Sequence, residues 1–188
     1  MRVLKQLVVV SGIILFTLSA SVYSQKAPPF SRYKVRIEKF GKVTVNLRSH
    51  KNARMFRTNL RNAAAQEDVN FAGHYILTGW GCGTNCSQWA IIDARNGAVF
   101  FPEQLEGVGF GFCELPKNAI PMDAPPEAGE GGEGPIFHKT NSRMLLLTGF
   151  TGGGLDNQQS KCGNYFFEWT GNRLRQVKFI PGKRTDRP

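Results

Sequence analysis

The stretch N-F-A-G-H-Y-I-L-T-G-W-G-C-G-T-N-C-S-Q-W, from Asn70 to Trp89, decides the fold. It combines the aromatic and β-branched residues that are enriched in strands with glycines that interrupt them. The alternation predicts a strand over 71–80 with two distinct faces. One face carries Phe71, Gly73, Tyr75 and Leu77, and the other carries Ala72, His74, Ile76 and Thr78.

Further strand patterns lie on both sides of this stretch. The segment Asp93 to Gly97 (D-A-R-N-G) has the composition of a hairpin turn between strands over 88–93 and 98–101. We expect five more strands, over 33–38, 42–47, 143–150, 164–169 and 173–180, with turns at 40–42 and 170–172.

One segment changes to a helical period. Phe56, Leu60, Ala63 and Ala64 recur at helical spacing and predict an amphipathic helix over 52–67, capped near Ser49 or Asn52. The expected fold is therefore α+β, a mostly antiparallel meander of hairpins with one helix packed on the sheet.

Three glycine- or proline-bearing segments are less regular. G-V-G-F-G-F over 107–112 predicts a strand with Val108, Phe110 and Phe112 on one face and bare glycines on the other. The segment 124–135 (APPEAGEGGEGP) offers few side chains that can pack, so we expect a flexible acidic loop. The tail 181–188 is expected to be frayed.

The N-terminus has the layout of a secretory signal peptide. Arg2 and Lys5 precede an apolar run over 7–18, and small residues lead to a plausible cleavage site before Gln25. We expect residues 1–24 to be removed, leaving one domain over 25–188 that is periplasmic or secreted and has no transmembrane span. An uncleaved anchor helix is the alternative.

The cysteines fit an exported protein. An even set of four suggests two disulfides, whose three possible connectivities the sequence leaves open. We favour Cys82 with Cys86 and Cys113 with Cys162. The glycines around Cys82 resemble a phosphate loop only in spacing, because no helix follows them, and we expect them to let the chain turn there.

The charge is unevenly distributed. The formal net charge is +10, and residues 26–61 hold 11 Lys or Arg against one acid, while 103–133 hold seven acids against one base. On the expected helix, Lys51, Arg54, Arg57 and Arg61 form a basic ridge that could bind a protein or an anionic envelope ligand. A solvated helix face is the alternative, and nucleic acid is not expected because no aromatics interleave with these charges.

His74 carries the strongest catalytic hypothesis. It could act as a general base with Cys82 or Cys86 as nucleophile and Asp93 as the group that orients the imidazole. The alternative is a core histidine, which the oxidising compartment favours, because a nucleophilic thiol must stay reduced. No metal or cofactor is expected, since only two of the four cysteines are close in sequence.

Tyr75 and Trp80 are further candidate contact residues. Whether the aromatic side chains, Trp80 and Trp89 among them, line a pocket or complete the core stays open at this point. The oligomeric state is open as well. The leading interpretation is an exported, disulfide-stabilised binding module without enzymatic activity, and the alternative is a secreted hydrolase or thiol enzyme that uses His74.

Longer motifs carry a resemblance. They are N-F-A-G-H-Y, W-G-C-G-T-N-C, A-I-I-D-A-R-N-G-A-V-F-F-P, S-R-M-L-L-L-T-G and C-G-N-Y-F-F-E-W-T-G-N-R-L, spread over about Asn52 to Leu174. The chain resembles a family of exported bacterial proteins for which no activity is established. The resemblance implies a Gram-negative exported protein, and it assigns no catalytic residue.

Overall fold

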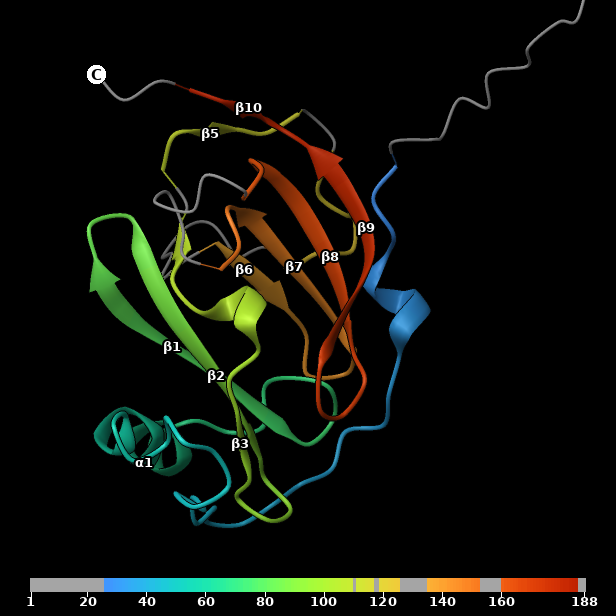
Figure 1. Cartoon of the computed structure of the whole chain (residues 1–188). Helices are drawn as coiled ribbons and strands as arrows, with labels where there is room; N and C mark the ends of the chain where they lie inside the picture. Colours follow the sequence, from blue (N-terminus) through green and yellow to red (C-terminus); the bar gives the residue numbers. More distant parts are fainter. Residues whose placement is uncertain (1–25, 110, 117–118, 126–134, 153–159, 186–188) are drawn as a thin grey trace, which may run out of the picture.

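The computed structural model describes residues 26–109, 111–116, 119–125, 135–152 and 160–185. Two antiparallel sheets face each other, and one helix lies on the outer side of the first sheet (Figure 1). This confirms the expected α+β class. The expected signal peptide 1–24 and most of the acidic loop 124–135 lie outside the described residues. No helix within the described residues is long and apolar enough to cross a membrane.

The first sheet is built on one long hairpin. Its strands are β1 (Tyr75–Gly83), β2 (Cys86–Asp93), β3 (Val99–Phe100) and β4 (Val108–Gly109). β1 and β2 pair over their whole length, while β3 and β4 both pair with the other edge of β2. The predicted hairpin turn between β2 and β3 is confirmed, because Gly97 donates its backbone N–H to the Asp93 carbonyl oxygen at 2.8 Å.

The second sheet is a meander in chain order. Its strands are β6 (Ile136–His138), β7 (Met144–Gly149), β8 (Gly163–Trp169) and β9 (Leu174–Pro181). A separate two-stranded sheet pairs β5 (Cys113–Glu114) with β10 (Lys183–Arg184). The tail is therefore not frayed throughout, since β10 holds it against β5.

Both sheets are covered on both faces. Alternate residues of β1, β2, β7 and β8 meet in a central cluster between the sheets, which includes Tyr75, Leu77, Ile91, Leu145, Phe167 and Trp169. The residues between them face outward, toward the helix on one side and toward the N-terminal segment around Phe30 on the other. Strands buried on both faces have nearly continuous apolar sequences. This explains runs such as M-L-L-L in β7.

The helix α1 (Arg57–Gln66) starts five residues later than predicted. Phe56 is the N-cap residue and supplies no side-chain cap, so capping by Ser49 or Asn52 was wrong. The Ser49 hydroxyl instead accepts the backbone N–H of Val99 at 2.8 Å, which ties the preceding turns to β3. Leu60, Ala63 and Ala64 are buried against the first sheet as the period predicted.

The expected hairpin over 33–47 is wrong. This segment is an extended strap whose hydrogen bonds go to loops, such as Glu38 N–H to the Gly73 carbonyl oxygen at 2.8 Å. Its alternation is nevertheless used, because Val43, Val45 and Leu47 pack against the helix side of the first sheet. A period of two reports which side chains are buried and does not identify the backbone partner.

Two other strands are shorter than expected. Among the described residues of 107–112, which leave out Phe110, Val108 and Gly109 form a strand, and Phe112 has a positive φ of 59°. The strand expected over 71–80 begins at Tyr75, because the residues before it form a turn. A short 3-10 helix, η1 (Phe30–Tyr33), precedes the strap, and another, η2 (Glu103–Leu105), follows β3.

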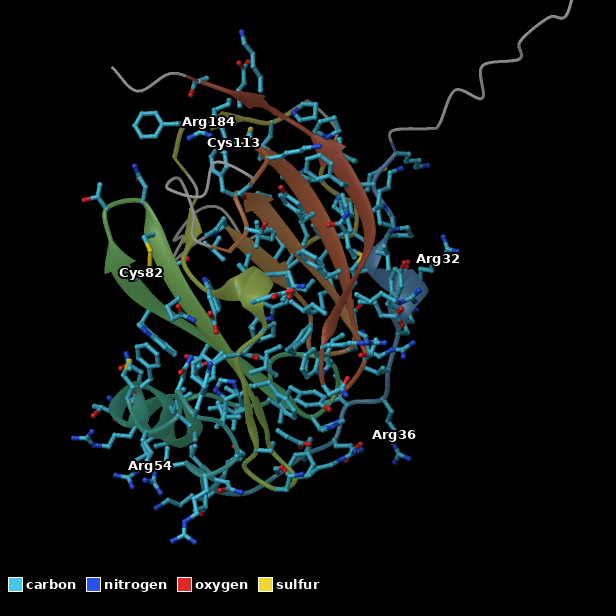
Figure 2. The ribbon with its side chains drawn as sticks, in the orientation of Figure 1. Arg32, Arg36, Arg54, Cys82, Cys113 and Arg184 are labelled. Atoms are coloured by element: carbon cyan, nitrogen blue, oxygen red, sulfur yellow. A yellow bond between two sulfur atoms is a disulfide. The ribbon has the colours of Figure 1, made fainter. Side chains whose placement is uncertain are left out.

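The favoured disulfide pairing is confirmed. Cys82 and Cys86 are joined across the tip of the β1–β2 hairpin, where Figure 2 labels Cys82. Cys113 and Cys162 join β5 to the residue that precedes β8, over a sequence separation of 49. Both bonds therefore hold segments that lie at the ends of the two sheets.

Candidate functional site

A tight turn at the start of β1 positions His74. Phe71 and Tyr75 exchange both backbone hydrogen bonds, at 3.0 and 2.9 Å. The turn requires positive φ at Ala72 (45°) and Gly73 (86°). A Cβ on Gly73 would lie 2.4 Å from the Arg36 carbonyl oxygen, so only glycine fits there. His74 thus lies on a turn, and the expected placement on a strand face is wrong.

Polar side chains lock this turn to β1 and to the end of the helix. The Asn70 side chain pairs with the Leu77 backbone like a strand, accepting its N–H at 2.7 Å and donating to its carbonyl oxygen at 3.0 Å. Glu67, just after α1, accepts from Asn70 Nδ2 at 3.1 Å and from the Thr78 hydroxyl at 2.9 Å. The position of His74 is therefore fixed from two sides.

The imidazole of His74 lies between two carboxylates. Nδ1 is 3.9 Å from Glu38 Oε1, and Nε2 is 3.9 Å from Asp93 Oδ1, both beyond hydrogen-bond distance. Burial lowers the pKa of His74, and the Arg95 charge lowers it further, while Asp93 and Glu38 oppose the shift. The neutral imidazole is consequently the favoured form at neutral pH.

Arg95 organises the carboxylates around His74. Its guanidinium forms an ion pair with Glu38 through two hydrogen bonds, with Nε at 3.1 Å from Oε2. This pairing lowers the pKa of Glu38 and raises the pKa of Arg95. Asp93 Oδ1 accepts the backbone N–H of Arg95 at 2.9 Å, which bends the turn that carries Arg95 toward His74.

Two aromatic side chains lie next to His74. Tyr75 is in ring contact with His74, with centroids 4.1 Å apart, and meets Trp169 edge-on at 5.5 Å. The Trp169 indole N–H is buried and has no partner with hydrogen-bond geometry. Burial raises the pKa of Tyr75, and the nearby Trp169 N–H opposes that shift. A cleft of about 280 Å³ opens over these side chains. We call it the base cleft, because it lies at the base of the β1–β2 hairpin, opposite the tip.

The base cleft is assembled from five separate segments. They are the strap, the turn before β1, the β2–β3 turn, the residue before β7 and the β8–β9 turn. The residues that line the cleft are Val35, Arg36, Glu38, Ala72, His74, Tyr75, Arg95, Arg143, Trp169, Thr170 and Gly171. Sequence analysis identified His74 and Tyr75 here, and Asp93 beside His74, but missed Glu38, Arg95, Arg143 and Trp169. Arg95 and Trp169 lie in the turn motifs D-A-R-N-G and W-T-G-N, whereas no motif marks Glu38 or Arg143.

The structure does not bring His74 together with the cysteines. His74 immediately precedes β1, and Cys82 is near the other end of that strand, about 26 Å away at ~3.3 Å per residue. Both sulfurs at the tip are also bonded to each other. Neither cysteine can therefore serve as a thiolate for His74 in this structure. Asp93 does lie beside His74, as expected.

The basic ridge is exposed as predicted, but only half of it is helical. Arg57 and Arg61 belong to α1, whereas Lys51 and Arg54 precede it, and all four residues are exposed (Figure 2, Arg54). Among the described residues, no acidic side chain forms an ion pair with these four. Met55 lies within the ridge and is 74% exposed.

The other aromatic candidates complete the core. Trp80 packs on Phe56 and Phe101, with ring centroids 4.9 and 6.4 Å away. Trp89 is buried, and its indole N–H donates to the Ser87 hydroxyl at 2.8 Å. Trp80 is therefore a packing residue between helix and sheet rather than part of the base cleft, which Tyr75 does line.

Two further kinds of site were considered, a metal site and the larger cavity beside the N-terminal segment. In the part of the chain that the structure describes, no three His, Cys, Asp or Glu side chains cluster as metal ligands. A larger cavity of about 580 Å³ lies beside residues 26–33. Its one carboxylate, Asp123, already accepts the backbone N–H groups of Phe30 and Ser31 at 3.0 and 2.8 Å. Both oxygens of the carboxylate that lines this cavity are therefore already engaged in hydrogen bonds to the backbone.

Comparison with known proteins adds no relative. No family model, no curated protein and no solved structure matches the chain.

Proposed function

We propose that the protein is an exported binding module that attaches to an anionic component of the bacterial envelope through its basic ridge. The observation that carries this proposal is the set of exposed cations at Lys51, Arg54, Arg57 and Arg61 around the exposed Met55, none of which forms an ion pair with a described acidic residue. Cations around an exposed apolar side chain are typical of segments that lie on anionic membrane surfaces.

Export is supported by two independent features. The N-terminal sequence has the layout of a signal peptide, and the cysteines of the folded part are joined as two disulfides. Disulfides persist mainly in oxidising compartments such as the periplasm. A periplasmic or secreted location and kinship with the exported bacterial family are parts of the same proposal. The alternative, a hydrolase or thiol enzyme based on His74, loses support because the sulfurs are distant and bonded.

The ridge is tested by charge reversal. We expect the Lys51→Glu, Arg54→Glu, Arg57→Glu, Arg61→Glu variant to lose at least about 10-fold in binding to phosphatidylglycerol vesicles, since each basic residue near such a surface contributes ~1 kcal/mol. Vesicle co-sedimentation at several salt concentrations measures this loss. Phosphatidylcholine vesicles should bind neither protein.

A matched variant separates the ridge from net charge. Arg32, Lys34, Arg173 and Lys183 are also exposed and lie outside the ridge, so reversing them changes the net charge equally. We expect this variant to bind nearly as well as the wild type. Equal losses in the two variants would mean that only net charge matters and would overturn the ridge as a site. Unchanged binding in the ridge variant would do the same.

Export is tested by mass spectrometry of the protein recovered from the periplasm or medium. We expect a chain that starts at Gln25 and contains no cysteine that can be alkylated without reduction. A peptide map should recover the two observed disulfides. Retention of residues 1–24 would instead support the anchor alternative, and a free thiol would contradict the disulfide-stabilised module.

A further inference from the structure

We propose that the base cleft binds a small molecule that consists of one ring and a carboxylate group. The carboxylate lies at Arg95 and Arg143, and the ring lies against Tyr75 and Trp169. This site is independent of the basic ridge. It lies at the opposite end of the β1–β2 hairpin from the disulfide, where turns at the ends of strands from both sheets meet.

The cleft offers guanidinium groups to an anionic ligand. Arg36, Arg95 and Arg143 line it together with the carboxylate of Glu38. Two further carboxylates lie outside the lining, Glu168 beside Arg143 and Asp93 beside His74. Figure 2 shows the Arg36 side chain extended away from the body of the protein, so the proposal uses only Arg95 and Arg143.

Both of these arginines are held in place but keep free donors. Arg95 pairs with Glu38, and Arg143 Nη2 lies 3.1 Å from Glu168 Oε1. A guanidinium has five N–H donors, so one carboxylate partner does not exhaust it. Their side chains are 50% and 46% exposed, which leaves them accessible to a ligand. Arginine recognises carboxylates with two parallel hydrogen bonds.

The inner wall contains polar groups that lack partners. Trp169 is 1% exposed, and its indole N–H has no acceptor with hydrogen-bond geometry. The Tyr75 hydroxyl is the group with which this N–H interacts. Buried donors without acceptors are costly. A ligand oxygen that accepts from the Tyr75 hydroxyl would complete this chain of donors.

The size and walls of the cleft restrict the ligand to one ring. Its volume of about 280 Å³ is at the lower end of small-molecule sites, ~300–1,000 Å³. The aromatic part of the lining comes from His74, Tyr75 and Trp169, of which Tyr75 and Trp169 are 6% and 1% exposed and present only a small part of each ring to the cleft. A ring bearing a carboxylate satisfies the walls and the arginines together. Such a ligand could be an aromatic acid or an acidic sugar, and binding experiments distinguish these sources.

The binding test uses benzoate and glucuronate as probes on the mature protein. Benzamide and methyl glucoside are the matched neutral probes. The readout is the Trp169 indole N–H signal in ¹H–¹⁵N NMR spectra, assigned with the Trp169→Phe variant. We expect at least one carboxylate to shift this signal saturably and its neutral analogue to bind at least about 10-fold more weakly. Preference for benzoate identifies an aromatic acid, and preference for glucuronate identifies an acidic sugar.

Two variants locate the binding. Tyr75→Phe removes only the hydroxyl, and Arg143→Gln removes one charge, so each should weaken the preferred carboxylate about 10-fold. Lys183→Gln, on β10 and outside both the base cleft and the basic ridge, is the control and should leave carboxylate binding unchanged. The proposal is overturned if no carboxylate shifts the Trp169 signal at millimolar concentration. Equal binding of the neutral analogues, or full binding by both folded cleft variants, would overturn it as well.

Discussion

The two ends of the β1–β2 hairpin differ in how they are held. At the tip, residues 81–84 are exposed, and the chain is closed covalently by the bond between Cys82 and Cys86. At the base, the turn before β1 is held by side-chain hydrogen bonds from Asn70 and Glu67 and by the Glu38–Arg95 ion pair. One stretch of 20 residues therefore contains a covalent closure and a polar, partly buried site.

This difference shows that two residues close in sequence can be far apart in space when an extended strand lies between them. His74 and Cys82 are eight residues apart, a separation that a loop could close completely. An extended strand instead separates them by about 26 Å at ~3.3 Å per residue. The tip therefore contributes stability. The polar and charged side chains of the candidate site lie at the base, where several turns meet.

The largest expected effect contrasts two glycines of this hairpin. Gly73→Ala should lower the free energy of unfolding by about 3 kcal/mol, because its positive φ disfavours side chains and its Cβ would collide with the Arg36 carbonyl. Gly81→Ala, near the tip, meets nothing within 4 Å, so it should change stability by less than about 0.5 kcal/mol. Urea unfolding measures both.

Similar losses in these two variants would contradict the contrast between a tightly packed base and an open tip. An undisturbed Gly73→Ala protein would mean that the strap moves away from the turn easily. In that case the base cleft would not be a preorganised site. The Gly73→Ala protein should also lose carboxylate binding at the base cleft, whereas Gly81→Ala should keep it.

A smaller effect is expected from opening the tip. The Cys82→Ser, Cys86→Ser variant should lose about 2 kcal/mol of stability, because the loop that the bond closes is short and constrains the unfolded chain little. Its NMR signals at Trp169 and Gly171 should remain unchanged. Changes that spread to the base cleft would show that the two ends are coupled and would contradict their independence.

The fold class could be predicted from the sequence because buried residues recur at regular intervals, every three to four residues in the helix and every second residue in a strand. Leu60, Ala63 and Ala64 marked the buried helix face, and the alternation within β1 marked the two clusters on either side of that strand. The sequence did not predict the helix start, because the hydroxyl of Ser49 is used by Val99 of a distant strand. Nor did it show that the strap pairs with loops, since backbone partners are set by tertiary packing.

The candidate site was only half predictable for the same reason. His74, Tyr75 and Asp93 stood out because they lie in or beside one conspicuous stretch. Arg143 and Trp169 enter the cleft from the second sheet, and nothing local distinguishes them from other surface or core residues. The two sheets must be packed together before their turns meet. The disulfide partners were favoured correctly, since Cys82 and Cys86 flank the only turn of the first hairpin.

The smallest expected effect is a pH dependence that originates at the base. His138 on β6 contacts the Asn70 carbonyl oxygen through Nδ1 at 3.1 Å and meets the Phe71 ring edge-on. Burial lowers the pKa of His138, and the hydrogen bond to Asn70 opposes that shift. Below about pH 6.5 the unfolded chain therefore takes up this proton more readily than the folded chain. The stabilisation is present above that pH and is lost as the pH falls toward the lowered folded-state value.

The His138→Phe variant isolates this contribution. It should lose about 1 kcal/mol at pH 7, where the hydrogen bond to Asn70 is missing. Between pH 7 and pH 5, however, its free energy of unfolding should fall less steeply than that of the wild type. The Cys82→Ser, Cys86→Ser variant should keep the wild-type slope, because the tip contributes no histidine. Parallel pH profiles for wild type and His138→Phe would place the proton uptake elsewhere, and His74, whose pKa is also lowered by burial, would be the next histidine to replace.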